Sequence, residues 1–172
     1  MIFRFRVLLD ATADCFRDIE IAGSDSLEDF HNVIMQSFQL AGDEMASFYE
    51  SDEEWNQGAE YGLFDMTGGM APVKKMQDVK VEDTFNETST RMIYVYDFLN
   101  MWTFLVELAD VAGPVDGTAY PQVIFAIGEL PDSPPDKEFE ADPRFHQDDE
   151  NDDQIDEDDF YDEENHDDYD LY

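Results

Sequence analysis

One change of hydrophobic period limits what this chain can fold into. From residue 27 to residue 38 the large apolar side chains recur every three to four residues, at Leu27, Phe30, Ile34 and Phe38. This spacing places them on one face of an α-helix. Ser24 to Ser26 offer side-chain oxygens for the N-cap of that helix, and Gly42 can end it. The apolar segments on either side alternate with period two, so the sequence predicts one principal helix packed on β-strands.

Two period-two segments precede the helix. Residues 2–9 place four apolar side chains on one face, Phe3, Phe5, Val7 and Leu9. Residues 15–21 alternate in the same way, with one face made of Cys15, Arg17, Ile19 and Ile21. About five residues separate the two segments, which suits an antiparallel hairpin. The predicted ββα start resembles a β-grasp arrangement in topology, a likeness that implies no function.

Further strands are predicted after the helix, at residues 45–51, 59–65 and 121–128 and within the aromatic run of residues 92–108. The aromatic run contains two alternating segments. We expect a two-residue turn at Leu99-Asn100 between them, or a wider loop because Leu does not favour the positive φ of a primed turn. The predicted fold class is α+β, with a mostly antiparallel or mixed sheet and one principal helix.

The chain ends in an acidic segment of different composition. The whole chain has a formal charge of −35, of which −15 lies between Asp148 and Tyr172, where no Lys or Arg occurs, and −20 lies before Asp148. A segment with low hydrophobicity and high charge does not offset the entropy lost on ordering. We therefore predict one α+β domain over residues 1–140 and a disordered acidic tail over residues 141–172.

The charge and the motifs exclude several function classes. A net charge of −20 before the tail disfavours direct nucleic-acid binding, which depends on Lys and Arg that contact phosphates. No apolar run reaches the roughly 20 residues of a membrane span, and residues 1–10 lack a secretion signal, so we expect a cytoplasmic protein. Cys15 is the single cysteine, the three histidines are dispersed, and no Gly-rich phosphate loop occurs. The sequence therefore predicts no disulfide, metal site or cofactor.

Asp97 and His31 are the candidates for chemistry. Asp97 lies between Tyr96 and Phe98, and a carboxylate desolvated by aromatic neighbours has a raised pKa and can act as an acid, a base or a ligand. The simpler interpretation is a turn residue that accepts backbone N–H hydrogen bonds. His31 borders the apolar face of the helix, where a half-buried, hydrogen-bonded imidazole is the alternative to a catalytic or ligand role.

Aromatic side chains in acidic surroundings are candidates for partner binding. Trp55 lies in an acidic loop, where it either folds over the sheet edge or anchors a partner, and Trp102 follows the hairpin turn. In the tail, Phe160, Tyr161 and Tyr169 are spaced among carboxylates, as in segments that dock on basic proteins. The alternative is a tail that only keeps the protein soluble.

Several motifs together carry a likeness to a known family. They are SLEDFHNVIMQSF at Ser26 to Phe38, the preceding FRDIEI, the YDF hairpin and the Pro-containing segment from Gly128 to Pro135. Over roughly residues 2–139 the chain resembles the plasmid pRiA4b ORF-3-like family, also described as a transposon passenger group. The tail resembles that of an acidic variant of the family. The resemblance implies the fold and an association with mobile elements, but no activity.

The departures from the family pattern lie mainly in the hairpin. Leu99-Asn100 stands where the family commonly has Gly-Asp, and Phe104 stands where it has His. Near the end of the body, the family's PPED motif is replaced by Pro-Pro-Asp-Lys at residues 134–137. If the family hairpin holds a polar site, this chain lacks its histidine.

Three functional hypotheses follow. The first is a small cytoplasmic protein-binding or adaptor module whose acidic tail contacts a basic protein. The second is a ligand-binding domain or enzyme that uses Asp97 and His31, with or without a metal, and it requires these side chains to converge in one pocket. The third is an accessory protein whose tail serves solubility alone.

Overall fold

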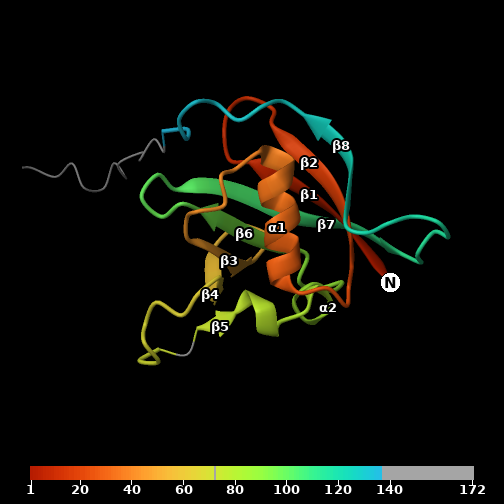
Figure 1. Ribbon diagram of the computed structural model, residues 1–172, viewed down its shortest axis with the longest axis horizontal. Helices are drawn as coiled ribbons and strands as arrows, with labels where there is room; N and C mark the ends of the chain where they lie inside the picture. Colours follow the sequence, from red (N-terminus) through yellow and green to blue (C-terminus); the bar gives the residue numbers. More distant parts are fainter. Residues whose placement is uncertain (72, 137–172) are drawn as a thin grey trace, which may run out of the picture. The chain divides into compact units, whose positions relative to one another are not determined.

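The computed structural model describes residues 1–71 and 73–136, within which eight strands form one mixed sheet (Figure 1). The strands are β1 Ile2–Leu9, β2 Phe16–Ala22, β3 Ala46–Ser51, β4 Gln57–Gly62, β5 Lys74–Lys75, β6 Arg91–Tyr96, β7 Trp102–Ala112 and β8 Gln122–Ile127. They lie in the order β5-β4-β3-β6-β7-β1-β2-β8, and every neighbouring pair is antiparallel except β4 with β5. The predicted α+β class is confirmed, whereas the predicted boundary at residues 140/141 and the predicted tail disorder lie outside the described residues.

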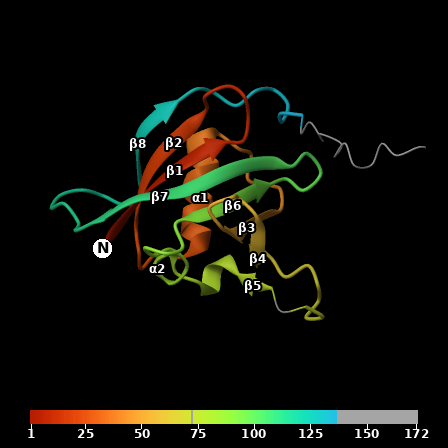
Figure 2. The ribbon, with the colours of Figure 1, turned by 180° about the vertical axis from the view of Figure 1, so that it is seen from behind.

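One principal helix covers one face of the sheet. The helix α1, Leu27–Phe38, crosses the strands in Figure 1, and Figure 2 shows the opposite face with α1 beyond the strands. A 3₁₀ turn, η1 Met76–Asp78, and a short helix, α2 Val81–Thr84, follow β5. The predicted alternation of β1 and β2 is confirmed, because Phe5 pairs with Ile19 and both are fully buried.

The helix α1 begins at a capping box. The Ser26 hydroxyl accepts a hydrogen bond from the Asp29 N–H, and the Asp29 carboxylate accepts one from the Ser26 N–H. The predicted end at Gly42 is wrong. Gln39 takes the left-handed conformation, with φ of 59°, and the Leu40 N–H donates to the Met35 carbonyl, which satisfies the last turn before Gly42 is reached.

Aromatic rings fill the space between α1 and the sheet. Phe30 of α1 lies between Phe5 of β1 and Phe48 of β3, with ring centroids 4.7 and 5.5 Å apart. The cluster continues with two more rings. Tyr94 of β6 lies beside Phe48, and Phe85, just after α2, lies beside Phe5. Because each aromatic side chain buries a large apolar area, this cluster supplies much of the hydrophobic stabilisation of the fold.

The hairpin between β6 and β7 has a five-residue loop, Asp97–Met101, so the predicted two-residue turn at Leu99-Asn100 is wrong and the wider loop is correct. Asp97 and Met101 adopt positive φ of 60° and 57° at its two ends. The Met101 N–H donates to the Asp97 carbonyl, and the Asp97 N–H donates to the carbonyl of Met45. The loop therefore closes on its own backbone and on the segment before β3.

Candidate functional site

Asp97 is a turn residue in this structure. Its carboxylate accepts hydrogen bonds from the Asn100 side-chain amide at 2.6 Å and from the Leu99 and Asn100 N–H groups at 3.1 and 3.3 Å. The Asn100 side chain first, and the two backbone groups with it, hold the pKa of Asp97 below its ordinary value. The turn interpretation of Asp97 is therefore confirmed, and the alternative, a pKa raised by aromatic desolvation, is wrong because hydrogen bonds to the charged form outweigh burial.

His31 lies deeper than the predicted half-buried position. It faces the sheet from α1 with 2% of its surface exposed, and its Nδ1 forms a 2.7 Å hydrogen bond with the Tyr94 hydroxyl of β6. Burial lowers the pKa of His31 to about 4, so the imidazole is neutral near pH 7. The contact joins the helix to the sheet beside the aromatic cluster.

The structure gives Asp97 and His31 separate partners. Asp97 lies three residues beyond Tyr94 in sequence, a span of about 10 Å at the rise of a strand. Neither residue lines the pockets described below. Among residues 1–71 and 73–136, no three His, Cys, Asp or Glu side chains are grouped so that they hold a metal ion.

The two tryptophans of the body are half-buried. Trp55, with φ of 63°, lies in the loop between β3 and β4, and the Arg91 guanidinium carbon is 5.0 Å from its ring centroid. Arg91 also donates to the Glu53 carbonyl, so the loop folds back toward the start of β6. Trp102 pairs with Tyr96 where β6 and β7 meet their loop. The predicted binding residues Phe160, Tyr161 and Tyr169 lie outside the described residues.

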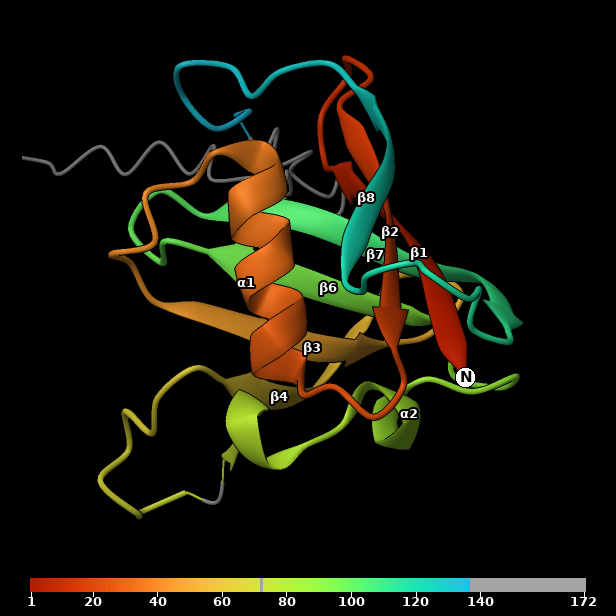
Figure 3. The ribbon, with the colours of Figure 1, turned by 45° about the vertical axis from the view of Figure 1, so that its right-hand side comes forward.

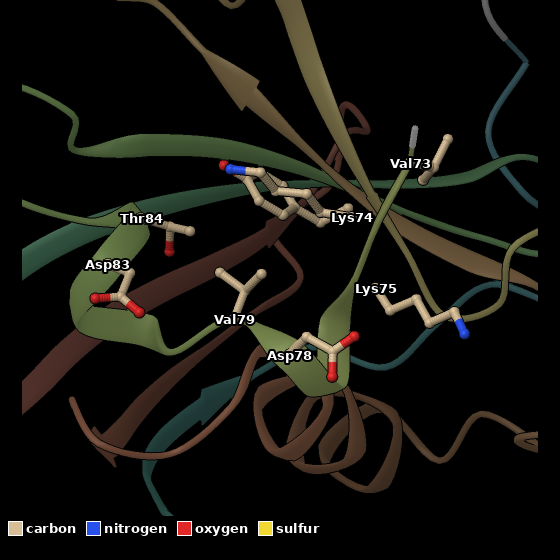
Figure 4. A pocket seen from close by; sticks show the side chains of 8 residues that line it. Val73, Lys74, Lys75, Asp78, Val79, Asp83 and Thr84 are labelled. Carbon is tan, nitrogen blue, oxygen red and sulfur yellow. The ribbon is translucent and has the colours of Figure 1, made fainter. Parts of the chain in front are cut away.

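A surface pocket of about 410 Å³ opens between β4, β5 and α2 (Figure 4). Two lysines and two carboxylates share its rim, at Lys74, Lys75, Asp78 and Asp83. Its wall includes the Tyr61 ring, whose centroid is 5.8 Å from the Lys74 Nζ, and the Tyr61 hydroxyl donates to Glu50 at 2.5 Å. The four charged side chains of the lining sum to zero, so the pocket does not favour either sign of charge.

A second pocket, of about 280 Å³, lies at the other end of β3 and β4. Its lining includes Glu50, Asp52, Asn56 and Arg91. The Asp52 carboxylate accepts hydrogen bonds from the Asn56 backbone and side chain, so it serves the loop between β3 and β4. The first cause of its lowered pKa is the Asn56 side chain. The Asp52 carboxylate and the Asn56 side chain of this pocket therefore already have partners in the loop that they stabilise, whereas the buried Arg91 Nε has no hydrogen-bond partner among the described residues.

The strand β8 forms an exposed apolar edge that the sequence pattern did not reveal. It pairs with β2 alone among the described strands, and Figure 3 shows it at the margin of the sheet. Four of its six side chains are large, apolar and 39–50% exposed, at Val123, Ile124, Phe125 and Ile127. The signal for this surface is the uncharged run QVIFAI in a chain with 31% charged residues.

Arg17 is a second feature that sequence reasoning missed. Its guanidinium is buried and donates four hydrogen bonds of 2.8–3.0 Å to backbone carbonyls, those of Phe16, Ser37, Ile127 and Gly128. It also lies 4.6 Å from the Phe38 ring centroid. A positive charge is favourable there because the last carbonyls of a helix carry partial negative charge. Arg17 thereby joins the end of α1, β2 and the end of β8.

Residues 1–168 match the family model of the plasmid pRiA4b ORF-3-like proteins. The chain belongs to this family. A solved structure with a similar fold is the protein of unknown function MM3350 from Methanosarcina mazei Go1, with a TM-score of 0.65 and 18% identity. The similarity covers 73% of the present chain and 68% of the Methanosarcina chain. No functionally curated protein matches the sequence.

The hairpin of this pRiA4b ORF-3-like protein shows how its departure from the family pattern is accommodated. Phe104, at the position where the resemblance implies a histidine, is fully buried. Its ring lies 4.7 Å from Phe38 and 5.8 Å from Tyr94, centroid to centroid. The Phe104 ring therefore extends the aromatic cluster at the position where the family pattern has an imidazole.

Within the described part of the chain, no helix is long and apolar enough to span a membrane.

Proposed function

We propose that this protein is a protein-binding or adaptor module that recognises basic partner proteins. The observation that carries the proposal is the large excess of negative charge, with 44 acidic and 9 basic residues. Several of the basic residues are already engaged, since Arg4 and Arg6 pair with Glu20 and Asp18 at 2.7 and 2.8 Å, and Arg17 is buried. A field of this sign attracts cationic surfaces and accelerates their association.

Exposed apolar side chains add contact area to this electrostatic attraction. The apolar side chains of β8 at Val123, Ile124, Phe125 and Ile127 are 39–50% exposed and lie on the same acidic body. Charge steers the encounter, while apolar and aromatic contacts supply most of the binding energy at protein interfaces. The acidic aromatic tail belongs to the proposed interaction surface. The proposal includes a cytoplasmic location and an association with mobile elements, which the family's plasmid origin supports.

The test is a pull-down from lysate of the source organism, analysed by mass spectrometry at low and high salt. The full chain is compared with a version that ends at Gln147 and with a full-length control whose tail Asp and Glu residues become Asn and Gln. We expect basic proteins to be retained by the full chain and released by high salt, because salt screens exposed charges. Retention by the full chain of proteins without a basic bias, or binding that is indifferent to salt, would contradict the proposal.

A further inference from the structure

Within residues 1–71 and 73–136, the edge of β8 has less protection than exposed strands normally carry. Edge strands usually avoid pairing with other chains through short length, inward charges, prolines, β-bulges or a covering loop. The opposite edge of the sheet fits this rule, because β5 is two residues long and consists of Lys74 and Lys75. In contrast, β8 spans six residues with no charge and no proline between Gln122 and Ile127, although its pairing with β2 shifts register between Asp18 and Ile19. No described strand pairs with the outer edge of β8, and this edge is therefore a template for an added strand.

The side chains of β8 offer apolar contacts on both faces of the sheet. Phe125 lies opposite Asp18 on the face away from α1, where its ring centroid is 5.9 Å from that of Phe16. Val123 pairs with the fully buried Ile19, whose side chain belongs to the core on the α1 face. Val123 and Phe125 lie on opposite faces although they are two residues apart, because the register shift beside Asp18 and Ile19 interrupts the alternation, and an added strand with apolar residues therefore finds a neighbour on each side.

Both ends of β8 are fixed by hydrogen bonds to β2. Arg17 donates to the Ile127 and Gly128 carbonyls at one end, at 2.8 and 3.0 Å. The Gln122 side chain donates to the Glu20 carboxylate at 2.8 Å at the other end. A strand held in this way needs little further ordering when a partner pairs with it, and pre-organisation of this kind favours affinity.

The charge of the protein indicates which kind of chain pairs with the edge of β8. A second copy of the chain brings a further net charge of −35, and like charges brought together oppose association. The basic side chains nearest to β8 in the sheet, Arg4, Arg6 and Arg17, are paired or buried. From these observations we infer that β8 binds an extended segment of another protein, in which Lys or Arg alternates with aliphatic residues, by adding it as a ninth strand of the sheet. This inference rests on the proposed function and names its partner class.

The test uses the full-length chain and a fluorescent peptide of alternating Lys and Val, about ten residues long to exceed the length of β8. A control peptide has the same sequence but carries N-methyl groups on alternate amides, which removes backbone donors and keeps charge and side chains. Binding is followed by fluorescence anisotropy, and amide hydrogen exchange locates the protected strand. We expect protection at residues 122–127 and about tenfold weaker binding of the methylated peptide.

Two variants separate strand addition from plain charge attraction. Phe125→Glu makes the edge more acidic and removes its most exposed ring, whereas Leu99→Glu makes the same type of change at a distant exposed loop. Strand addition predicts about tenfold weaker binding for Phe125→Glu and unchanged binding for Leu99→Glu. If Phe125→Glu binds as tightly as the unmodified chain, or if both peptides bind equally, β8 is not the site.

The remaining outcomes distinguish failure of this inference from failure of the proposed function. Peptide binding that depends on the acidic tail and leaves the β8 amides unprotected overturns the β8 site but supports recognition of basic partners. No peptide binding, together with no basic partner in the pull-down, overturns both. A concentration-dependent dimer with protected β8 amides in the absence of peptide overturns the assignment to a foreign segment in favour of a second copy.

Discussion

At the scale of single residues, two buried polar side chains are stabilised in different charge states, one as a cation and one as a neutral group. The Arg17 guanidinium is stabilised because four backbone carbonyls accept its N–H groups, one at the end of α1, one in β2 and two at the end of β8. His31 is held neutral, since its surroundings provide the Tyr94 hydroxyl and apolar rings but no carboxylate hydrogen bond. Each contact joins elements that are distant in sequence, so both residues serve the assembly of the fold.

We expect His31 to make the protein less stable as the pH falls from about 6.5 toward 4. The pKa of His31 is about 4 in the folded chain and 6.5 in the unfolded chain, so only the unfolded state takes up a proton in this range. The contribution to the free energy of unfolding falls by about 2 kcal/mol between pH 7.5 and pH 5.

Urea denaturation of the unmodified chain and of His31→Gln at both pH values measures this contribution. Carboxylate titration is common to the two proteins, so the difference between them isolates the imidazole. Identical pH profiles for the two proteins would rule out a depressed pKa at His31.

Arg17→Lys is expected to destabilise the fold although it keeps the positive charge. A lysine ammonium cannot reproduce the four planar hydrogen bonds, and each buried carbonyl left without a donor costs about 1–3 kcal/mol. We expect a loss of about 3 kcal/mol in the free energy of unfolding by urea denaturation. Hydrogen exchange is expected to rise most in β8, where two of the bonds end.

Arg6→Lys is the matched control for Arg17→Lys, because Arg6 forms a half-exposed ion pair with Asp18. Pairs of this kind contribute about 0–1 kcal/mol, so the loss is expected to be small. Equal losses for the two lysine variants would contradict the role assigned to Arg17.

At the scale of elements, α1 depends on its ends as well as on its apolar face. The capping box at Ser26 and Asp29 satisfies N–H groups of the first turn, and the left-handed Gln39 ends the helix. The helix then presents Phe30, Ile34 and Phe38 to the sheet. Because a helix of 12 residues is marginal in isolation, packing on the sheet supplies most of its stability and the caps fix where it starts and ends.

Ser26→Ala is expected to lower the free energy of unfolding by about 1 kcal/mol, because the Asp29 N–H loses its side-chain acceptor. Ser24→Ala is the control, since Ser24 is an exposed serine two residues earlier that does not cap the helix. Thermal or urea unfolding of the two variants gives the comparison. A loss for Ser24→Ala as large as that for Ser26→Ala would show that the cap lies elsewhere.

At the scale of the whole molecule, repulsion between carboxylates opposes folding. The chain has 44 acidic and 9 basic residues, so most carboxylates have no cation to pair with. A net charge far from zero destabilises the compact state, whereas exposed ion pairs such as Arg4 with Glu20 contribute only about 0–1 kcal/mol each. Repulsion therefore outweighs attraction over the molecule.

Added salt is expected to stabilise the protein. Between about 0.01 and 0.5 M NaCl the screening length falls from roughly 30 Å to a few Å, so repulsion weakens more than the few ion pairs do. We expect the melting temperature to rise steeply at low salt and then level off, which distinguishes screening from a solvent effect that grows steadily with concentration. A melting temperature that falls as salt is added would mean that ion pairs dominate.

Local pattern determined part of this structure without any tertiary information. The stripe from Leu27 to Phe38 specified α1, and alternation specified β1 and β2, because side-chain direction follows the backbone period. The sequence also offered both interpretations of Asp97, a raised pKa and a hydrogen-bonded turn. Only the position of the Asn100 amide decided between them.

Tertiary structure alone decided the position of β8 and the role of Arg17. The run QVIFAI has the composition of a buried strand, yet it lies at the margin of the sheet, where β2 pairs with it on one side and no described strand pairs with it on the other. Arg17 shares a face with Ile19 and Ile21, and its partners come from residues 20 and more than 100 positions away. Strand order and long-range hydrogen bonds depend on which segments meet in space, and local periodicity does not reveal which segments these are.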